Sequence, residues 1–168
     1  MQKDYSIESS KTSRCPPDWI DLGHHGCYYV STGKTMSYKD SQKFCNSLGG
    51  HLIEIYNKEI QKIVANLNIS SYHRFWIGAK TMRNKNTGRI ESWFWQSSKQ
   101  PLNFTNWLIG EPNNAEGNEF CIEMDVSQNH RWVDTQCERS DRAKPFCQMY
   151  IRKFTHWQKS PNVPPFPQ

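Results

Sequence analysis

The chain has 168 residues, the length of one ordinary domain with a hydrophobic core. Aromatic residues make up 13% of it, which excludes a disordered chain. The net charge is +5 with no run of about five or six like charges, so the charge does not indicate nucleic acid as a partner. No segment approaches about 18 consecutive apolar residues, so we expect no membrane insertion, and residues 1–14 lack the apolar region of a signal peptide.

The first half of the chain predicts a polar lead over residues 1–14, a short strand at Tyr28–Val30 and then a helix. Ser37 is placed to cap this helix, which runs through Leu48. The glycine pair that begins at Gly49 ends it, because glycine adopts the left-handed conformation without strain. The inner face of the helix is predicted to comprise Ser41, Phe44, Cys45 and Leu48.

A second helix follows a predicted strand at His51–Ile55 and is capped by Asn57. Its apolar stripe comprises Ile60, Ile63, Val64 and Leu67. The helical period then disappears, and short strands are predicted at Phe75–Ala79, Trp93–Gln96, Cys121–Met124, Arg131–Asp134 and Pro145–Ile151. Helices followed by strands predict an α+β fold. The domain is expected to span residues 15–150, with an extended Pro-rich tail at 151–168.

Six cysteines are widely spaced, and none forms a C-x-x-C pair, which argues against structural zinc. An even number at such spacing favours three disulfides in an oxidising compartment, although the spacing alone does not say which cysteines pair. The sequons at Asn68 and Asn103 are also typical of a secreted glycoprotein. We therefore expect an extracellular protein, or the lumenal part of a larger one.

One acidic segment interrupts this basic chain. From Gln100 to His130 there is no Lys or Arg in 31 residues, and the segment holds six asparagines together with the carboxylates of Glu111, Glu116, Glu119, Glu123 and Asp125. Carboxylate and amide oxygens are the ligands that Ca²⁺ prefers. The segment therefore indicates either a calcium site or a solvated acidic loop.

Several motifs then occur in a fixed order: Cys15-Pro16-x-x-Trp19, Cys27-Tyr28, Ser37-Tyr38-x-x-Ser41-x-x-Phe44-Cys45, Leu48-Gly49-Gly50-His51-Leu52, Phe75-Trp76-Ile77-Gly78, Asn106-Trp107, Glu111-Pro112-Asn113 and Trp132-Val133-Asp134. Together with the six cysteines, this order resembles the C-type lectin-like domain of the long form over about residues 15–150. The resemblance implies two helices flanking small antiparallel sheets, with a long Ca²⁺-stabilised loop from about Lys80 to Asn118. It also implies the disulfides Cys15–Cys27, Cys45–Cys147 and Cys121–Cys137.

The same resemblance implies a combined metal and sugar site. Glu111, Asn113, Glu119 and Asp134 match Ca²⁺ ligands of the family, and Pro112 matches its cis-proline. Glu111, Asn113 and Glu119 would also bind a sugar, whose vicinal hydroxyls coordinate the ion directly. In the family, Glu-Pro-Asn accompanies mannose, fucose and GlcNAc-type sugars, so the chain is expected to be a secreted Ca²⁺-dependent lectin for glycans of this type. Weak single sites of this kind benefit from multivalency, so a homo-oligomer is a further expectation.

One departure from the family's motif favours an alternative function. Val133 stands where the family has an asparagine that supplies a calcium oxygen and a sugar hydrogen bond. A water, Asn129 or His130 would have to fill the gap, and Phe120 stands where a second calcium site often has aspartate. The alternative is a degenerate or Ca²⁺-independent domain that binds a protein or another non-sugar ligand.

The remaining candidates have ordinary explanations. His24 and His25 lie in a predicted turn rather than at a metal, and Glu116, Glu123 and Asp125 are expected to be solvated or structural. The tryptophans that we expect in the core are Trp76, Trp93, Trp95, Trp107 and Trp132. The basic stretch, either a solvated loop or a contact for an acidic ligand, comprises Lys80, Arg83, Lys85 and Arg89. An enzyme is not expected, because there is no serine nucleophile elbow and a Ca²⁺ ion would keep Glu111 and Glu119 ionised.

Overall fold

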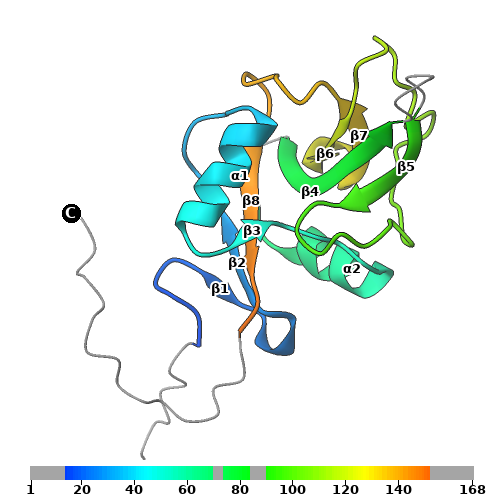
Figure 1. The fold of residues 1–168 in the computed structure, drawn as a ribbon. Helices are drawn as coiled ribbons and strands as arrows, with labels where there is room; N and C mark the ends of the chain where they lie inside the picture. Colours follow the sequence, from blue (N-terminus) through cyan, green and yellow to red (C-terminus); the bar gives the residue numbers. More distant parts are fainter. Residues whose placement is uncertain (1–13, 70–73, 84–89, 152–168) are drawn as a thin grey trace, which may run out of the picture.

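A computed structural model describes residues 14–69, 74–83 and 90–151 (Figure 1). Two α-helices and eight strands occur in these ranges. In chain order the elements are β1 (Ile20–Asp21), the 3-10 turn η1 (Gly23–His25), β2 (Cys27–Val30), α1 (Tyr38–Ser47), β3 (His51–Leu52), α2 (Lys58–Asn66), β4 (Arg74–Arg83), β5 (Ile90–Trp95), β6 (Cys121–Asp125), the 3-10 turn η2 (Val126–Gln128), β7 (Arg131–Thr135) and β8 (Lys144–Met149).

Both helices begin at the residues that the sequence predicts. The Ser37 side chain accepts a hydrogen bond from the Asp40 backbone N–H at 3.2 Å and caps α1. The Asn57 side chain does the same for Ile60 at 2.9 Å and caps α2. Each cap satisfies an N–H that has no partner within the first helical turn.

The strands follow the order β1-β2-β8-β4-β6-β7, with β3 added on β8 and β5 on β4. All pairings are antiparallel except that of β4 with β8, where Phe75 and Trp76 lie opposite Lys144 and Pro145. Figure 1 shows β8 beside α1 and β4 leading away to β5, β6 and β7. The long loop after β5 therefore lies on the part of the molecule built from β4–β7. The predicted α+β class is confirmed. The parallel pairing of β4 with β8 joins the two antiparallel halves of the sheet.

Several predicted boundaries are wrong: β5 runs over Ile90–Trp95 rather than Trp93–Gln96, and β8 ends at Met149 rather than Ile151. Two further errors concern the path of the chain to the long loop. The strand predicted at His51–Ile55 ends at Leu52, because the chain then passes from β8 to β4. Ile53 N–H donates to Phe146 at 2.8 Å while the Ile53 carbonyl accepts from Gly78 at 2.7 Å, so this buried segment links both halves of the sheet. The close approach requires glycine, since a Cβ at Gly78 would lie 2.7 Å from the Leu52 carbonyl oxygen.

The second of these errors concerns the long loop, which does not begin at Lys80. β4 continues to Arg83 and pairs with β5, so this part of the predicted loop belongs to a β-hairpin. The irregular segment runs instead from Gln96 to Phe120. A connection of this length without regular secondary structure is uncommon in a compact domain and is usually functional when it is ordered.

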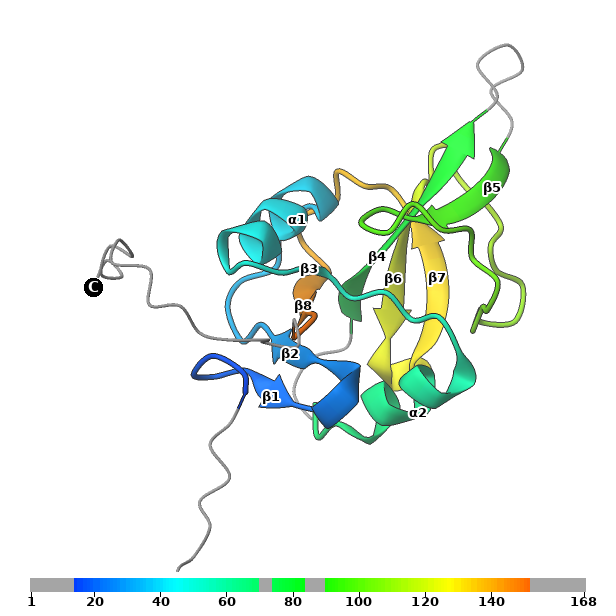
Figure 2. The same cartoon turned by 60° about the horizontal axis from the view of Figure 1, so that its bottom comes forward.

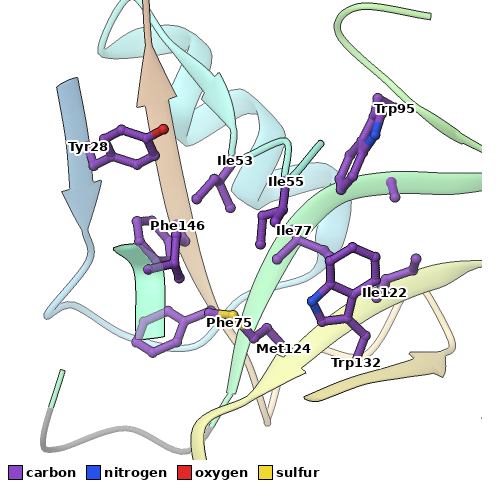
Figure 3. Packing of buried hydrophobic residues seen from close by; sticks show 12 residues of the cluster. Tyr28, Ile53, Ile55, Phe75, Ile77, Trp95, Ile122, Met124, Trp132 and Phe146 are labelled. Carbon is purple, nitrogen blue, oxygen red and sulfur yellow. The ribbon is translucent and has the colours of Figure 1, made fainter. Parts of the chain in front are cut away.

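The core lies between α2 and the two halves of the sheet. Figure 3 shows Tyr28, Phe75 and Phe146 on one side of it and Trp95 and Trp132 on the other. The fully buried tryptophans are Trp76, Trp95 and Trp132, while Trp93 and Trp107 are partly buried against the same cluster. The core role predicted for these five tryptophans is confirmed.

The three disulfides join the cysteine pairs implied by the resemblance, and all six cysteines are described and bonded. Cys45–Cys147 closes a separation of 102 residues and fastens α1 to β8. Cys121–Cys137 joins the start of β6 to the segment after β7. Cys15–Cys27 fastens the first described residues to β2.

Candidate functional site

The long loop between β5 and β6 is fixed at its start by a buried carboxylate. Glu54 is 0% exposed, and its Oε1 accepts hydrogen bonds from the backbone N–H groups of Ser97 at 2.8 Å and Ser98 at 3.1 Å. The Tyr56 hydroxyl donates to the other carboxylate oxygen. Because the loop turn supplies hydrogen bonds to a buried charge, it is expected to keep one conformation.

Tilted and edge-to-face aromatic contacts fix the middle of the loop. The ring of Trp107 lies 5.2 Å from that of Trp93 on β5 and 6.0 Å from that of Trp132 on β7. Leu108 N–H donates to the Trp132 carbonyl at 2.9 Å, and Trp132 N–H donates to the Asn106 carbonyl at 2.9 Å. The chain entering Glu111 is therefore paired directly to β7.

The four predicted site residues lie in one cluster at the exit of this paired segment. The Glu111–Pro112 peptide bond is cis, and the backbone then approaches Asp134 of β7. Asp134 is 4% exposed, and its two oxygens accept from the backbone N–H groups of Asn113 at 3.0 Å and Asn114 at 2.8 Å.

Glu119 is connected to the same cluster through Ala115. Ala115 N–H donates to Glu119 Oε2 at 2.6 Å and to Asn113 Oδ1 at 2.7 Å. Glu119 N–H donates to Asn114 Oδ1 at 3.0 Å. Asn114 thus shapes the loop around the site, a role that the sequence reasoning missed because its only signal is one more asparagine in an asparagine-rich segment.

The cluster carries excess negative charge. Burial, followed by the neighbouring Asp134 carboxylate, raises the pKa of Glu111 to about 7. Burial also raises the pKa of Glu119, and the charges of Asp134 and Glu116 add to the effect. Within the described residues, Glu111 Oε2 is buried and has no hydrogen-bond partner. A bound cation would remove both penalties.

The donor set of carboxylate and amide oxygens suits Ca²⁺. The cluster is wider than a compact transition-metal site, because in the described part of the chain three His, Cys, Asp or Glu ligand atoms meet within 4.8 Å only at His24, His25 and Glu59. Ca²⁺ does not require so compact a set, because it takes about six to eight oxygen ligands in flexible geometry. The side chains of Glu111, Asn113, Glu119 and Asp134 therefore fit this ion by chemistry and by their shared location.

Val133 leaves a gap in the donor set. It lies on β7 opposite Glu123 and is 6% exposed, with no oxygen in its side chain. Asn129 and His130 do not fill the gap, because they precede β7 at the opposite end of the strand from Asp134. The four-residue step from His130 to Asp134 spans about 13 Å along an extended strand.

Other acidic residues of the segment are structural. Arg74 lies 3.0 Å from both the Glu123 and the Asp125 carboxylates, which are 0% and 3% exposed. Burial raises the pKa of Glu123 to about 7 even though the Arg74 charge lowers it. Glu116 accepts a hydrogen bond from Gln136. These residues support β4, β6 and the segment after β7 rather than the cluster around Glu111.

The basic stretch is only partly described. Lys80 lies over the Tyr38 ring with its Nζ 5.6 Å from the ring centroid, and Arg83 ends β4. Lys85 and Arg89 lie outside the described residues, as does part of the sequon at Asn68. Asn103 is exposed.

The family follows from comparison with known proteins. The family model described as "Lectin C-type domain" matches residues 34–159. The chain belongs to the C-type lectin domain family. Its members are non-enzymatic binding proteins, so the expectation that this chain is not an enzyme is confirmed. Among the described residues, no helix has both the length and the apolar character needed to cross a membrane.

Curated relatives agree with this assignment. Perlucin from Haliotis laevigata is 32% identical over 126 residues, which cover 70% of this chain and 76% of that protein. A protein named C-type lectin mannose-binding isoform from Oxyuranus scutellatus is 29% identical over 141 residues, covering 80% and 84%.

Solved structures show the same fold. The carbohydrate-recognition domain of the mouse scavenger receptor C-type lectin has a TM-score of 0.68 at 25% identity, covering 82% of this chain and 99% of that one. The cow CD23 domain, determined in the presence of a GlcNAc2Man3 oligosaccharide, has a TM-score of 0.68 at 27% identity, covering 84% and 99%. A calcium-independent type II antifreeze protein has the same fold at 23% identity and a TM-score of 0.65.

Proposed function

We propose that this C-type lectin domain is a secreted, Ca²⁺-dependent lectin that binds mannose-, fucose- or GlcNAc-type glycans at the cluster formed by Glu111, Asn113, Glu119 and Asp134. The observation that carries the proposal is the buried Glu111 Oε2, which has no partner among the described residues and lies beside the Asp134 carboxylate. Three disulfides support an oxidising, extracellular location.

The side chains have distinct roles in this proposal. Glu111 and Glu119 accept hydrogen bonds from sugar hydroxyls, while the exposed Asn113 amide donates one. Asp134 holds the backbone of residues 113–114 and thereby fixes the direction of the Asn113 side chain. A bound Ca²⁺ ion would coordinate two vicinal hydroxyls of the sugar and neutralise the carboxylates.

Sugar preference is proposed from the Glu-Pro-Asn motif together with the relatives. The relative from Oxyuranus scutellatus is named mannose-binding, and the cow CD23 domain was determined in the presence of a mannose-containing oligosaccharide. We test the preference by applying the chain to a glycan array in Ca²⁺ and again in EDTA. Signals for mannose- or fucose-type glycans that disappear in EDTA are expected. Signals for galactose-type glycans would contradict the proposed preference, and an absence of signal in both buffers would contradict sugar binding.

A second candidate function rests on Val133. Its buried apolar side chain removes one oxygen ligand from the site, which favours a domain that binds a protein or another non-sugar ligand. The calcium-independent antifreeze protein shows that the fold itself does not require the ion. If Val133→Asn creates Ca²⁺ and mannose binding that the natural chain lacks, the natural site is degenerate and the second function is favoured over the first.

A further inference from the structure

A separate group of metal-ligating side chains lies at the turn between β1 and β2. His24 and His25 of η1 and Glu59 of α2 each place one ligand atom within 4.8 Å of the others. His25 Nε2 is 3.7 Å from Glu59 Oε1, and the rings of His24 and His25 lie 3.8 Å apart. Figure 2 shows the blue η1 turn beside α2, away from the long loop that follows β5.

The turn that carries both histidines is held on several sides. Leu22 N–H donates to the Gly26 carbonyl at 3.0 Å, and Gly26 N–H donates to the Gly23 carbonyl at 3.1 Å. Gly26 has a φ of 99°, and a Cβ there would lie 2.6 Å from the Met149 carbonyl oxygen, so the turn packs tightly against the end of β8. Cys27, which follows directly, is bonded to Cys15. The histidines therefore have a fixed backbone support.

Glu59 is held independently of that turn. It lies in the first turn of α2, whose cap is formed by Asn57 at 2.9 Å from the Ile60 backbone nitrogen. The ligand atoms thus come from two supports whose separation is set by the fold, as in sites that bind a metal without reorganisation of the backbone.

The distances suit a small transition-metal ion. Bonds of about 2.0–2.1 Å in tetrahedral geometry place ligand atoms about 3.3 Å apart. The 3.7 Å separation between His25 Nε2 and Glu59 Oε1 exceeds this value only slightly, and side-chain rotation is sufficient to close it. Two imidazoles and one carboxylate favour Zn²⁺, Cu²⁺ or Ni²⁺ over Ca²⁺, which prefers oxygen ligands alone.

We propose that His24, His25 and Glu59 form a binding site for a divalent transition-metal ion such as Zn²⁺. The side chain of His25 is 16% exposed and that of Glu59 is 69% exposed, so the site opens to solvent on one side. A fourth coordination position would be available to water or to a donor from another molecule. The ion would join the β1–β2 hairpin to α2. This site shares no residue with the proposed calcium and sugar site, so either proposal can be wrong while the other is right.

Isothermal titration of Zn²⁺ into the metal-stripped full chain tests the proposal. Saturating Ca²⁺ in the buffer suppresses Zn²⁺ binding by oxygen ligands elsewhere. We expect one Zn²⁺ per chain. The substitutions His24→Asn, His25→Asn and Glu59→Gln each remove a direct ligand and should weaken binding by about tenfold or more, because even indirect partners of ligands contribute about that much. Unchanged thermal unfolding without metal confirms that each variant folds.

Two control variants separate this site from general metal binding. Glu138→Gln removes an exposed carboxylate from the segment after β7, outside the proposed site. His73→Asn removes a histidine outside the described residues. Neither should change the Zn²⁺ affinity. The proposal is overturned if the natural chain does not bind Zn²⁺, if His73→Asn removes the binding, or if the three ligand variants bind Zn²⁺ as tightly as the natural chain does.

Discussion

Replacement of Val133 by asparagine tests how the cluster around Asp134 works. Val133 is 6% exposed on β7, between the buried Trp132 and Asp134. Without Ca²⁺, Val133→Asn loses the burial of an aliphatic side chain and places an amide there, which is expected to reduce the free energy of unfolding by about 2 kcal/mol. For a chain of this length, the Tm should fall by about 4–8 °C.

In Ca²⁺ the Val133→Asn variant should recover part of the lost Tm. The new amide supplies the oxygen that Val133 lacks, and a gain of about 1.4 kcal/mol strengthens Ca²⁺ binding by about tenfold. An ion that binds only the folded state stabilises it according to its concentration relative to Kd, so the Tm difference between Ca²⁺ and EDTA should be larger for Val133→Asn than for the natural chain.

Val133→Ala is the matched control for this experiment. It removes apolar contacts at the same position without adding a ligand, so its Tm falls in both buffers and its response to Ca²⁺ matches that of the natural chain. Thermal unfolding of the three proteins in Ca²⁺ and in EDTA provides the comparison. If Val133→Asn responds to Ca²⁺ no more than Val133→Ala does, residue 133 does not face the ion and the placement of the site is refuted.

Three further predictions concern the sugar, the support of β7 and the pH. Glu111→Gln combined with Asn113→Asp should shift glycan-array signals toward galactose, and a persisting mannose preference would contradict the site. Gln61→Met removes the acceptor 3.0 Å from the Trp132 indole N–H and should lower the free energy of urea unfolding by about 1–3 kcal/mol; a loss below about 0.5 kcal/mol would contradict this. Burial lowers the pKa of His130 below 6.5, so the unfolded chain binds more protons there and stability falls as the pH drops through about 6.5. His130→Asn keeps a residue that tolerates the φ of 59° and should weaken that pH dependence, measured by urea unfolding at about pH 7.5 and about pH 5.5; an unchanged dependence would contradict it.

Local signals predicted the helices well. The caps at Ser37 and Asn57 involve residues only three positions apart, so the sequence contains the whole interaction. The strand predicted at His51–Ile55 was too long because an apolar run looks the same in a strand and in a buried connection. Only the tertiary position of Ile53, between Phe146 and Gly78, distinguishes the two.

The supports of the candidate site could not be predicted from local pattern. Glu54 lies 43 residues before Ser97 in the sequence, and nothing near either residue indicates their hydrogen bond. The resemblance did select Glu111 and Asp134, which the fold brings together across Asn113. It did not predict that backbone N–H groups of the loop would donate to both Asp134 oxygens.

Calcium titration tests the central claim most directly. The stripped chain and its Glu111→Gln variant are titrated with Ca²⁺ by calorimetry, since glutamine keeps the shape of the side chain and one oxygen but removes the charge. The natural chain is expected to bind a Ca²⁺ ion, and the variant is expected to bind it at least about tenfold more weakly. If the natural chain does not bind Ca²⁺, or if both proteins bind it equally, the cluster around Glu111 is not the calcium site.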